Sequence, residues 1–206
     1  ASAWGAEGRR FKSGRPDHCG NDMLIMEKPA SCGLFRVRTP AREGYDGGMT
    51  RANELIREFG LEPHPEGGHY RRVYASERIV ESQGRKRPAI TAIRFLLQVG
   101  EYSQWHRVDA DESWHWQEGE ALELLQFDQA SCRLTATMLG NSARGLQAMQ
   151  VVPAGVWQAA RPLGEYALVG CTVSPGFDWK GFELLDASND VAARLRAAGA
   201  PLLTGG

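Results

Sequence analysis

The sequence predicts an all-β protein, a sandwich or barrel built from short strands. Between about residues 89 and 173, short segments rich in apolar and β-branched residues recur, with turn residues between them. Many evenly spaced short strands are typical of sandwiches and barrels, whereas βαβ folds alternate strands with helices. The chain therefore belongs to the all-β class, with helices only outside the strand-rich region.

The strands are expected one after another along the middle of the chain. A Pro/Gly turn in "LEPHPEGGHYRRVYAS" leads into the first of them. The others are predicted at residues 89–99, 102–108, 112–117, 121–127, 132–139, 146–152, 155–160 and 165–173.

Two helices are expected beside the strands. In residues 50–60 three apolar side chains share one face, and Gly60 is placed to end the helix. A second helix is expected over about 188–198, where Val191 and Leu195 are spaced for one apolar face.

The chain of 206 residues suits one domain preceded by a segment of different composition. Residues 1–48 are rich in Gly, Arg, Ser and Pro and show no sustained apolar period. We expect them to be a disordered extension, or residues translated upstream of a natural start at Met49. Residues 49–206 are expected to form the single folded domain.

The composition restricts the classes of partner that the protein is expected to bind. A formal net charge of −1 provides no basic field for nucleic acid or an anionic membrane surface. The apolar run "AITAIRFLLQV" is interrupted by Arg94, so no bilayer-spanning segment is predicted, and no secretory signal is expected. The four cysteines lack CxxC spacing and are expected to be reduced. A cytoplasmic protein is expected, with organellar targeting by residues 1–48 left open.

One short stretch matches a known motif. Gly100, His106, Val108, Glu112 and Gly119 follow the spacing G-x5-H-x-H-x3-4-E-x6-G, except that valine replaces the second histidine. This pattern resembles the first motif of the cupin superfamily. In the segment "PAGVWQ", Pro153 and Gly155 resemble the core of the second motif, P-x-G-x-x-H, and Gln158 stands where a histidine is expected.

Four segments resemble one branch of that superfamily. They are "PHPEGGHYRRVY", "HRVDADESWHW", "VPAGVWQAA" and "VGCTVSPGFDWKGFEL". They are similar to the small-cupin family catalogued as a domain of unknown function and often likened to sugar-nucleotide epimerases. The resemblance spans about residues 49–190 and implies a double-stranded β-helix barrel, a homodimer and a ligand pocket inside the barrel. It implies no settled reaction.

Strand alternation selects the residues that face this pocket. Side chains two residues apart share a face of a strand. His106 therefore faces the barrel if the resemblance holds, and Glu112, Trp114 and Trp116 point together from the next strand. His115 points the opposite way. The two tryptophans would provide flat walls for a sugar ring or an aromatic group.

The metal set that the resemblance implies is incomplete. A cupin metal is usually held by three imidazoles and one carboxylate, and Val108 and Gln158 replace two of the imidazoles. Valine is no ligand and an amide oxygen is a poor one for such metals. The remaining candidates are His106, Glu112 and Gln158. No cofactor is firmly implied, and a weakly held divalent metal completed by water is left open.

Further polar residues are candidates for ligand binding. One of Arg71 and Arg72 could face the cavity and hold an anionic group, or both could be exposed edge charges. His69 lies on the same expected strand. Arg94 stands among apolar residues and is expected to face the pocket or a carboxylate. Glu66 is a carboxylate of the preceding turn, supported by the resemblance.

The segment "SPGFDWKGFEL" is interpreted as structural. Its three aromatic residues are expected to plug one end of the barrel. Asp178 is a candidate for orienting His106, although the structural interpretation is preferred.

Three functions are compatible with these residues. The first is an epimerase or isomerase acting on a sugar-like or sugar-nucleotide-like metabolite. His106 would transfer the proton, Glu112 would orient it, and Gln158 would donate a hydrogen bond to the substrate. The second is a non-catalytic small-molecule binding module that uses the same pocket. The third is a metal-dependent oxygenase, which the missing imidazoles disfavour.

Overall fold

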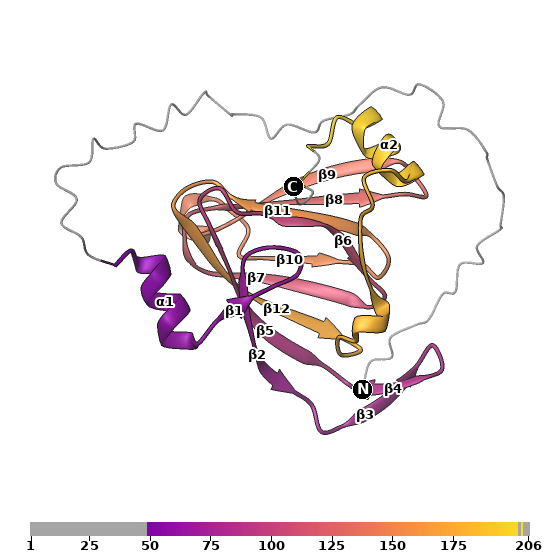
Figure 1. The fold of residues 1–206 in the computed structure, drawn as a ribbon, viewed down its shortest axis with the longest axis horizontal. Coiled ribbons are helices and arrows are strands. Elements are labelled where there is room, and N and C mark those ends of the chain that lie inside the picture. The colour runs from indigo at the N-terminus through magenta and orange to yellow at the C-terminus, as the bar shows by residue number, and fades with distance from the viewer. Residues whose placement is uncertain (1–48, 202, 204–206) are drawn as a thin grey trace, which may run out of the picture. The chain divides into compact units, whose positions relative to one another are not determined.

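The protein is described by a computed structural model that covers residues 49–201 and 203 (Figure 1). The expectations for residues 1–48 lie outside the described residues. Helix α1 (Arg51–Phe59) and helix α2 (Asp190–Ala197) stand before and after the strands, as predicted. Among the described residues, no helix is long and apolar enough to cross a membrane.

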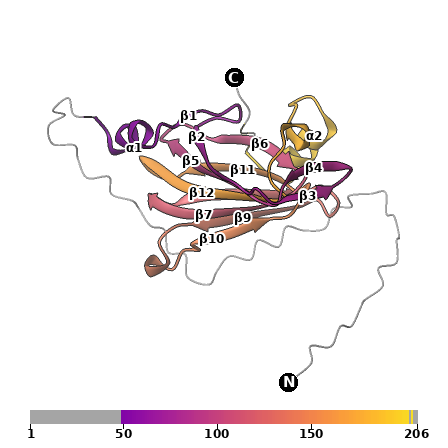
Figure 2. The ribbon, with the colours of Figure 1, turned by 90° about the horizontal axis from the view of Figure 1, so that it is seen from below.

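Two antiparallel sheets form the body of the described domain. The first has six strands in the order β1 (Glu62–Pro63), β2 (His69–Ala75), β5 (Thr91–Gln98), β12 (Tyr166–Ser174), β7 (Asp111–Gly119) and β10 (Met149–Val152). The second has five strands in the order β13 (Phe182–Leu184), β6 (Ser103–Val108), β11 (Trp157–Pro162), β8 (Leu122–Asp128) and β9 (Arg133–Leu139). Figure 1 shows the five-stranded sheet above the six-stranded sheet, and in Figure 2, seen from below, the strands of the two sheets lie one behind the other.

Each of the eight strand ranges predicted between residues 89 and 173 overlaps one observed strand, so the all-β class is confirmed. Two further features were not predicted. Strands β3 (Ile79–Ser82) and β4 (Arg85–Pro88) form a separate hairpin. Their sequence "IVESQGRKRP" is mostly polar or charged and lacks the apolar alternation of a strand that packs on a core. Strand β13 is only three residues long and follows a turn-forming segment.

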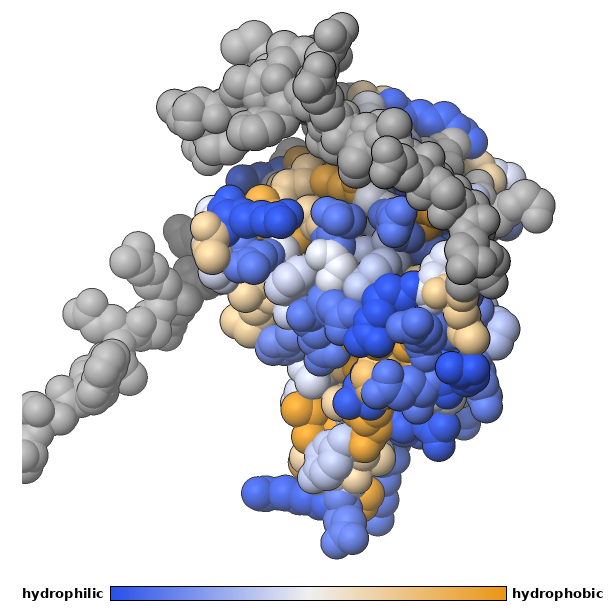
Figure 3. Space-filling view, turned by 90° about the vertical axis from the view of Figure 1, so that its left-hand side faces the viewer, coloured by the Kyte–Doolittle hydropathy of each residue, from blue (hydrophilic) through white to orange (hydrophobic). Residues whose placement is uncertain are grey.

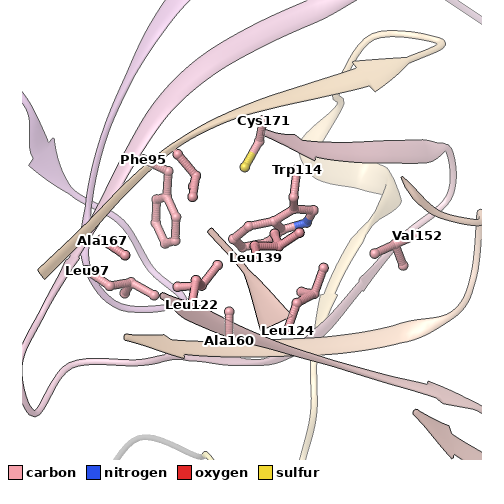
Figure 4. Close-up of a cluster of buried hydrophobic side chains, with 11 residues drawn as sticks. Phe95, Leu97, Trp114, Leu122, Leu124, Leu139, Val152, Ala160, Ala167 and Cys171 are labelled. Carbon is pink, nitrogen blue, oxygen red and sulfur yellow. The ribbon is translucent and has the colours of Figure 1, made fainter. Parts of the chain in front are cut away.

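The main core lies between the two sheets, because both contribute alternate side chains to it. Phe95, Trp114 and Val169 come from the six-stranded sheet, and Leu124 and Ala160 come from the five-stranded sheet. Figure 4 shows the side chains of this cluster converging from the surrounding strands. They fill one end of the space between the sheets and leave the other end for polar residues.

The helices cover the outer faces of the sheets. Helix α1 packs Leu55 against Leu96 and Leu168 of the six-stranded sheet. Helix α2 packs with Trp105 and Trp157 of the five-stranded sheet. Strands β5 and β11 are therefore buried on both faces, which explains their nearly continuous apolar sequences.

Part of the surface beyond the barrel is apolar. Val73, Tyr74 and Ile79 have exposed fractions of 51%, 54% and 56%. Figure 3 shows the face of the molecule that lies on the left-hand side of Figure 1. In the lower part of this face, where Figure 1 places β2, β3 and β4, apolar side chains lie among hydrophilic ones. The homodimer expected from the sequence stays a prediction.

The turn before β2 is fixed by two glycines. The His64 N–H donates to the Gly68 carbonyl over 2.9 Å, and the Gly67 N–H donates to the His64 carbonyl over 2.9 Å. Gly67 and Gly68 have φ of 108° and 66°, values that favour glycine. A Cβ atom on Gly67 would collide with the backbone carbonyl oxygen of Tyr102. The turn therefore sits against the β5–β6 connection with no room for a side chain.

We expect Gly67→Ala to destabilise the protein more than Gly84→Ala does. Both glycines have positive φ, but a Cβ on Gly84 meets nothing within 4 Å, so this control carries only the backbone cost of about 1 kcal/mol. Gly67→Ala adds the collision with Tyr102. Urea unfolding of both variants measures the difference, and equal losses would contradict a close approach at Gly67.

Candidate functional site

A cavity of about 40 Å³ lies between the sheets, beyond the apolar core. Strands β2, β5, β6, β7, β12 and β13 and the segment between β12 and β13 contribute to its wall. Six of its lining residues are aromatic: Tyr70, Phe95, Trp114, Phe177, Trp179 and Phe182. Four are titratable groups of the imidazole and carboxyl type: His64, Glu66, His106 and Glu112. The cavity thus combines apolar walls with a small set of convergent polar groups, as ligand sites do.

His106 lies on β6 and is only 2% exposed. Its Nδ1 atom is 2.8 Å from the Gln104 carbonyl oxygen, which can only accept a hydrogen bond. The proton of the neutral ring is therefore assigned to Nδ1, and Nε2 carries the lone pair. Burial lowers the pKa of His106, so the ring is neutral near pH 7.

Glu66 is the carboxyl group that contacts His106. Its Oε2 atom lies 3.4 Å from Nε2 of His106, and the Ser103 hydroxyl donates to Oε1 over 3.0 Å. The main chain joins the two segments as well, because the Gln104 N–H donates to the Glu66 carbonyl over 2.8 Å. Burial raises the pKa of Glu66 to about 8, against the opposing effect of the Ser103 hydrogen bond. At neutral pH Glu66 is thus a protonated acid facing the lone pair of an imidazole.

Glu112 lies on β7 and is bound by Gln158. The indole N–H of Trp114 donates to Oε1 of Gln158 over 2.9 Å, which fixes the orientation of the amide. The amide N–H of Gln158 then donates to Oε2 of Glu112 over 2.6 Å. Burial raises the pKa of Glu112 to about 7, while His106 acts to lower it. Glu112 thus accepts its hydrogen bond from Gln158 and acts on His106 through its charge, and Glu66 is the carboxyl group in contact with the imidazole. The expected role of Glu112 as the orienting partner of His106 stays a prediction.

His64 was not predicted as a site residue. Its ring stacks on Trp179 with centroids 5.6 Å apart and meets Tyr70 edge-on at 4.5 Å. Its Nδ1 atom accepts the backbone N–H of Glu66 over 3.3 Å. Burial lowers the pKa of His64 to about 4, so this imidazole is also neutral at pH 7. The sequence feature that could have identified His64 as a site residue is the segment "HPEGG", because one tight turn contains both His64 and Glu66.

The segment between β12 and β13 supplies Phe177 and Trp179 to the cavity wall, and β13 adds Phe182. Asp178 accepts the Lys180 N–H over 3.1 Å and caps the 3-10 helix Trp179–Gly181. Arg85 of the β3–β4 hairpin donates to Asp178 over 2.8 Å and also contacts Asp109. Asp178 is thus committed to Lys180 and Arg85, and the suggestion that it orients His106 is wrong.

The aromatic residues of this segment do more than close a barrel end. The Phe182 ring lies over the His106 ring with centroids 5.5 Å apart, and Trp179 is 48% exposed beside His64. Phe177 meets Trp179 edge-on at 5.0 Å. These side chains therefore form the part of the cavity wall closest to solvent.

Arg94 and Arg71 point away from the cavity, contrary to expectation. On β5 the cavity is lined by Thr91, Ile93 and Phe95, so Arg94 between them faces outward. Its guanidinium lies 3.9 Å from the centroid of the Phe59 ring in α1.

On β2 the same alternation turns Arg72 toward the cavity and Arg71 away from it. Arg71 donates to the Phe59 and Gly60 carbonyl groups that end helix α1, over 3.5 and 3.4 Å. Arg72 lines the cavity and is exposed to solvent. His69 shares the outer face with Arg71, and its Nδ1 atom lies 3.7 Å from Oε1 of Glu101.

Trp116 also lies outside the cavity. Its indole N–H donates to the Glu120 carbonyl over 3.0 Å, and its ring packs against the main core. The β7–β12 register shifts opposite it, between Leu168 and Val169. The pocket wall on β7 therefore ends at Trp114.

The donors at this site do not fit a cupin metal. Of the expected set His106, Glu112 and Gln158, the amide of Gln158 is already committed to Trp114 and Glu112. Val108 occupies the position of a further ligand and has no donor atom. Within residues 49–201, no group of three or more His, Cys, Asp and Glu side chains is arranged to hold a metal ion. No step is therefore assigned to a metal.

Fold and site together define a small β-barrel protein with a buried, aromatic-walled polar cavity. The family model "Cupin superfamily (DUF985)" matches residues 53–185, and the chain belongs to this family. A hypothetical protein from Leishmania major has a similar structure, with a TM-score of 0.67 and 29% identity over 72% of this chain and 95% of its own. A protein from Shewanella oneidensis matches with a TM-score of 0.65 and 34% identity over 73% of this chain and 94% of its own. No curated protein matches significantly.

These matches confirm the cupin resemblance and the double-stranded β-helix expected from it. The two similar structures are covered almost completely, so the likeness extends over nearly the whole of each solved chain.

Glu66→Gln is expected to remove a pH-dependent loss of stability. A carboxyl whose folded pKa of about 8 exceeds the ordinary 4.5 binds more protons folded than unfolded between these values. The unfolding free energy of the natural chain should therefore fall relative to that of Glu66→Gln as pH rises from about 4.5 to about 8. The slope is at most about 1.4 kcal/mol per pH unit.

Urea unfolding at several pH values measures this difference, and the exposed Glu62→Gln serves as the control that should show no such trend. A constant difference between Glu66→Gln and the natural chain would mean that Glu66 ionises as easily in the fold as in water.

Proposed function

We propose that this cupin is an enzyme of the epimerase or isomerase kind, which moves a proton on a small polar metabolite held in the cavity. The supporting observation is the buried pair of His106 and Glu66, with Nε2 and Oε2 3.4 Å apart. One member is a neutral base with its lone pair inside the cavity, and the other is an acid protonated near neutral pH. General acid–base catalysis needs groups whose pKa values lie near the working pH.

His106 and the carboxyl groups of Glu66 and Glu112 have different roles in the proposed reaction. Nε2 of His106 takes a proton from a carbon next to a carbonyl group, and the electron pair of that C–H bond moves onto the carbonyl oxygen. The O–H of Glu66 or Glu112 donates a hydrogen bond to the negative charge that forms there. Return of the proton to the same face regenerates the substrate, and inversion of the carbon requires that the intermediate turn its other face to His106 before the proton returns. Either outcome regenerates the base without any further reactant.

The cavity limits what enters. A volume of about 40 Å³ corresponds to roughly three water molecules, so only the reacting end of a substrate fits inside. A sugar or sugar-nucleotide-like substrate would place its remainder at the mouth, near Trp179 and Arg72. Arg72 could there pair with a phosphate or carboxylate.

A deuterium-incorporation assay tests the proposal even where the product has not been identified. The protein is incubated in D₂O with a panel of sugars, sugar nucleotides, hydroxy acids and amino acids, and mass spectrometry follows the gain of one mass unit. We expect one class of compound to exchange with the natural chain, and a loss of at least about 100-fold with His106→Asn, because general-base catalysis contributes about that much or more.

His69→Asn is the matched control, because His69 lies on the outer face of β2 and is not part of the cavity wall. It should exchange at the natural rate. Exchange that persists in His106→Asn would exclude His106 as the base. Saturable binding with no exchange in any protein would instead support the non-catalytic binding module.

A further inference from the structure

We infer that the inner end of the cavity binds a small ammonium group, held between Glu66 and Glu112 and enclosed by aromatic rings. The inference rests on the proposed function in that it takes the cavity to be the ligand site, and it adds the chemical class of the group that enters. It is carried by the hydrogen-bonding capacity of the wall, by its charges and by its aromatic composition.

The inner wall of the cavity presents hydrogen-bond acceptors. Nε2 of His106 carries a lone pair because the ring proton is on Nδ1, bound to Gln104. Oε2 of Glu66 faces that Nε2 atom and Nδ1 of His64, which already accepts a backbone N–H, so neither imidazole donates to it. Gln158 donates to Oε2 of Glu112, which leaves the lone pairs of Oε1 as further acceptors. Before a ligand binds, the Glu66 proton lies between Oε2 and Nε2, and an ammonium group that displaces this proton can donate an N–H to each of the three atoms.

The wall also lacks a fixed positive charge at this end. Among the described lining residues, the only Arg or Lys is Arg72, which is exposed to solvent. Glu66 and Glu112 are 6% and 7% exposed, and two carboxylates cannot both ionise in such a place without a positive partner. An ammonium group supplies that partner and lets a carboxyl group ionise when it binds, whereas an anionic ligand brings no such partner.

Aromatic rings complete the enclosure. Phe95 and Trp114 meet edge-to-face with centroids 5.8 Å apart at the inner wall, and Phe182 lies against His106. Cations bind favourably over aromatic faces, most strongly where water is excluded. A cavity of about 40 Å³ suits an ammonium head and one or two carbon atoms rather than a whole sugar ring.

Three probes of nearly equal size test the charge of the preferred group: ethanolamine, ethylene glycol and glycolate, which are cationic, neutral and anionic. Each is titrated into the full chain, and NMR follows the side-chain signals of His106 and Trp114. We expect ethanolamine to shift these signals saturably, with at least about tenfold higher affinity than either other probe. An equal or higher affinity for the glycol or the glycolate would overturn the inference, as would the absence of a shift with ethanolamine.

The outcome is separable from that of the deuterium assay. Exchange on compounds that carry no amine, together with weak ethanolamine binding, would leave the proposed isomerase standing and remove the ammonium inference. Tight ethanolamine binding without exchange on any compound would remove the proposed isomerase and leave the ammonium inference standing.

Two variants locate the binding. Glu112→Gln keeps the side-chain shape and a hydrogen bond to Gln158 but removes the charge, and we expect ethanolamine affinity to fall about tenfold while ethylene glycol affinity is unchanged. Phe182→Leu keeps an apolar side chain beside His106 but removes its π-face, and should lower ethanolamine affinity several-fold.

Phe59→Leu is the control for the second variant, because Phe59 packs in the α1 cluster outside the cavity. It should bind ethanolamine as the natural chain does. The Trp114 indole signal reports whether each variant keeps the fold. Folded Glu112→Gln with unchanged ethanolamine affinity would show that the carboxyl does not hold the ammonium group.

Discussion

The contact between Glu66 and His106 is the interaction on which the site depends. The two residues come from different elements, a turn before β2 and the middle of β6. One residue ties them together, since Gln104 donates its N–H to the Glu66 carbonyl and accepts the Nδ1 proton of His106 through its own carbonyl. The turn is so close to the β5–β6 connection that glycine is needed at Gly67. Backbone geometry thus sets the distance between acid and base.

The replacement of an imidazole by Gln158 changes what the barrel can do. In the hydrogen-bonded series Trp114, Gln158 and Glu112, the indole donates to the amide oxygen and the amide N–H donates to the carboxyl group. The carboxyl of Glu112 is held for hydrogen bonding inside the cavity rather than for coordination. In the proposed function, the β-barrel positions that would serve a metal in other cupins serve proton transfer and ligand binding instead.

Much of the fold and half of the site could be predicted from the sequence. Period-two alternation within β6 and β7 selects His106, Glu112 and Trp114 correctly as residues that share the inner space. The same rule fails for Arg94 because β5 is buried on both faces. Apolar neighbours then do not reveal which face is the interior, and helix α1 provides an outer partner in Phe59.

His64 shows a second reason why a site residue cannot be predicted from the sequence. It lies in a turn, where no period relates a side chain to a face, and its ring partner Trp179 comes from a loop far away in sequence. The role of Glu66 as partner of His106 is hidden for the same reason. Contacts between a turn and a distant strand depend on tertiary packing, which local sequence patterns do not encode.

The energetic cost of the cavity is itself an argument that it serves a purpose. Burial raises the pKa of both Glu66 and Glu112, and the charge of Glu66 further disfavours ionisation of Glu112. Apolar side chains of similar size would fill this space, next to the core of Phe95 and Trp114, with a gain in stability. Instead the chain uses a hydroxyl, an amide and two glycines to hold the carboxyl groups in place. Such an arrangement is expected where buried acids must stay protonated until a ligand arrives.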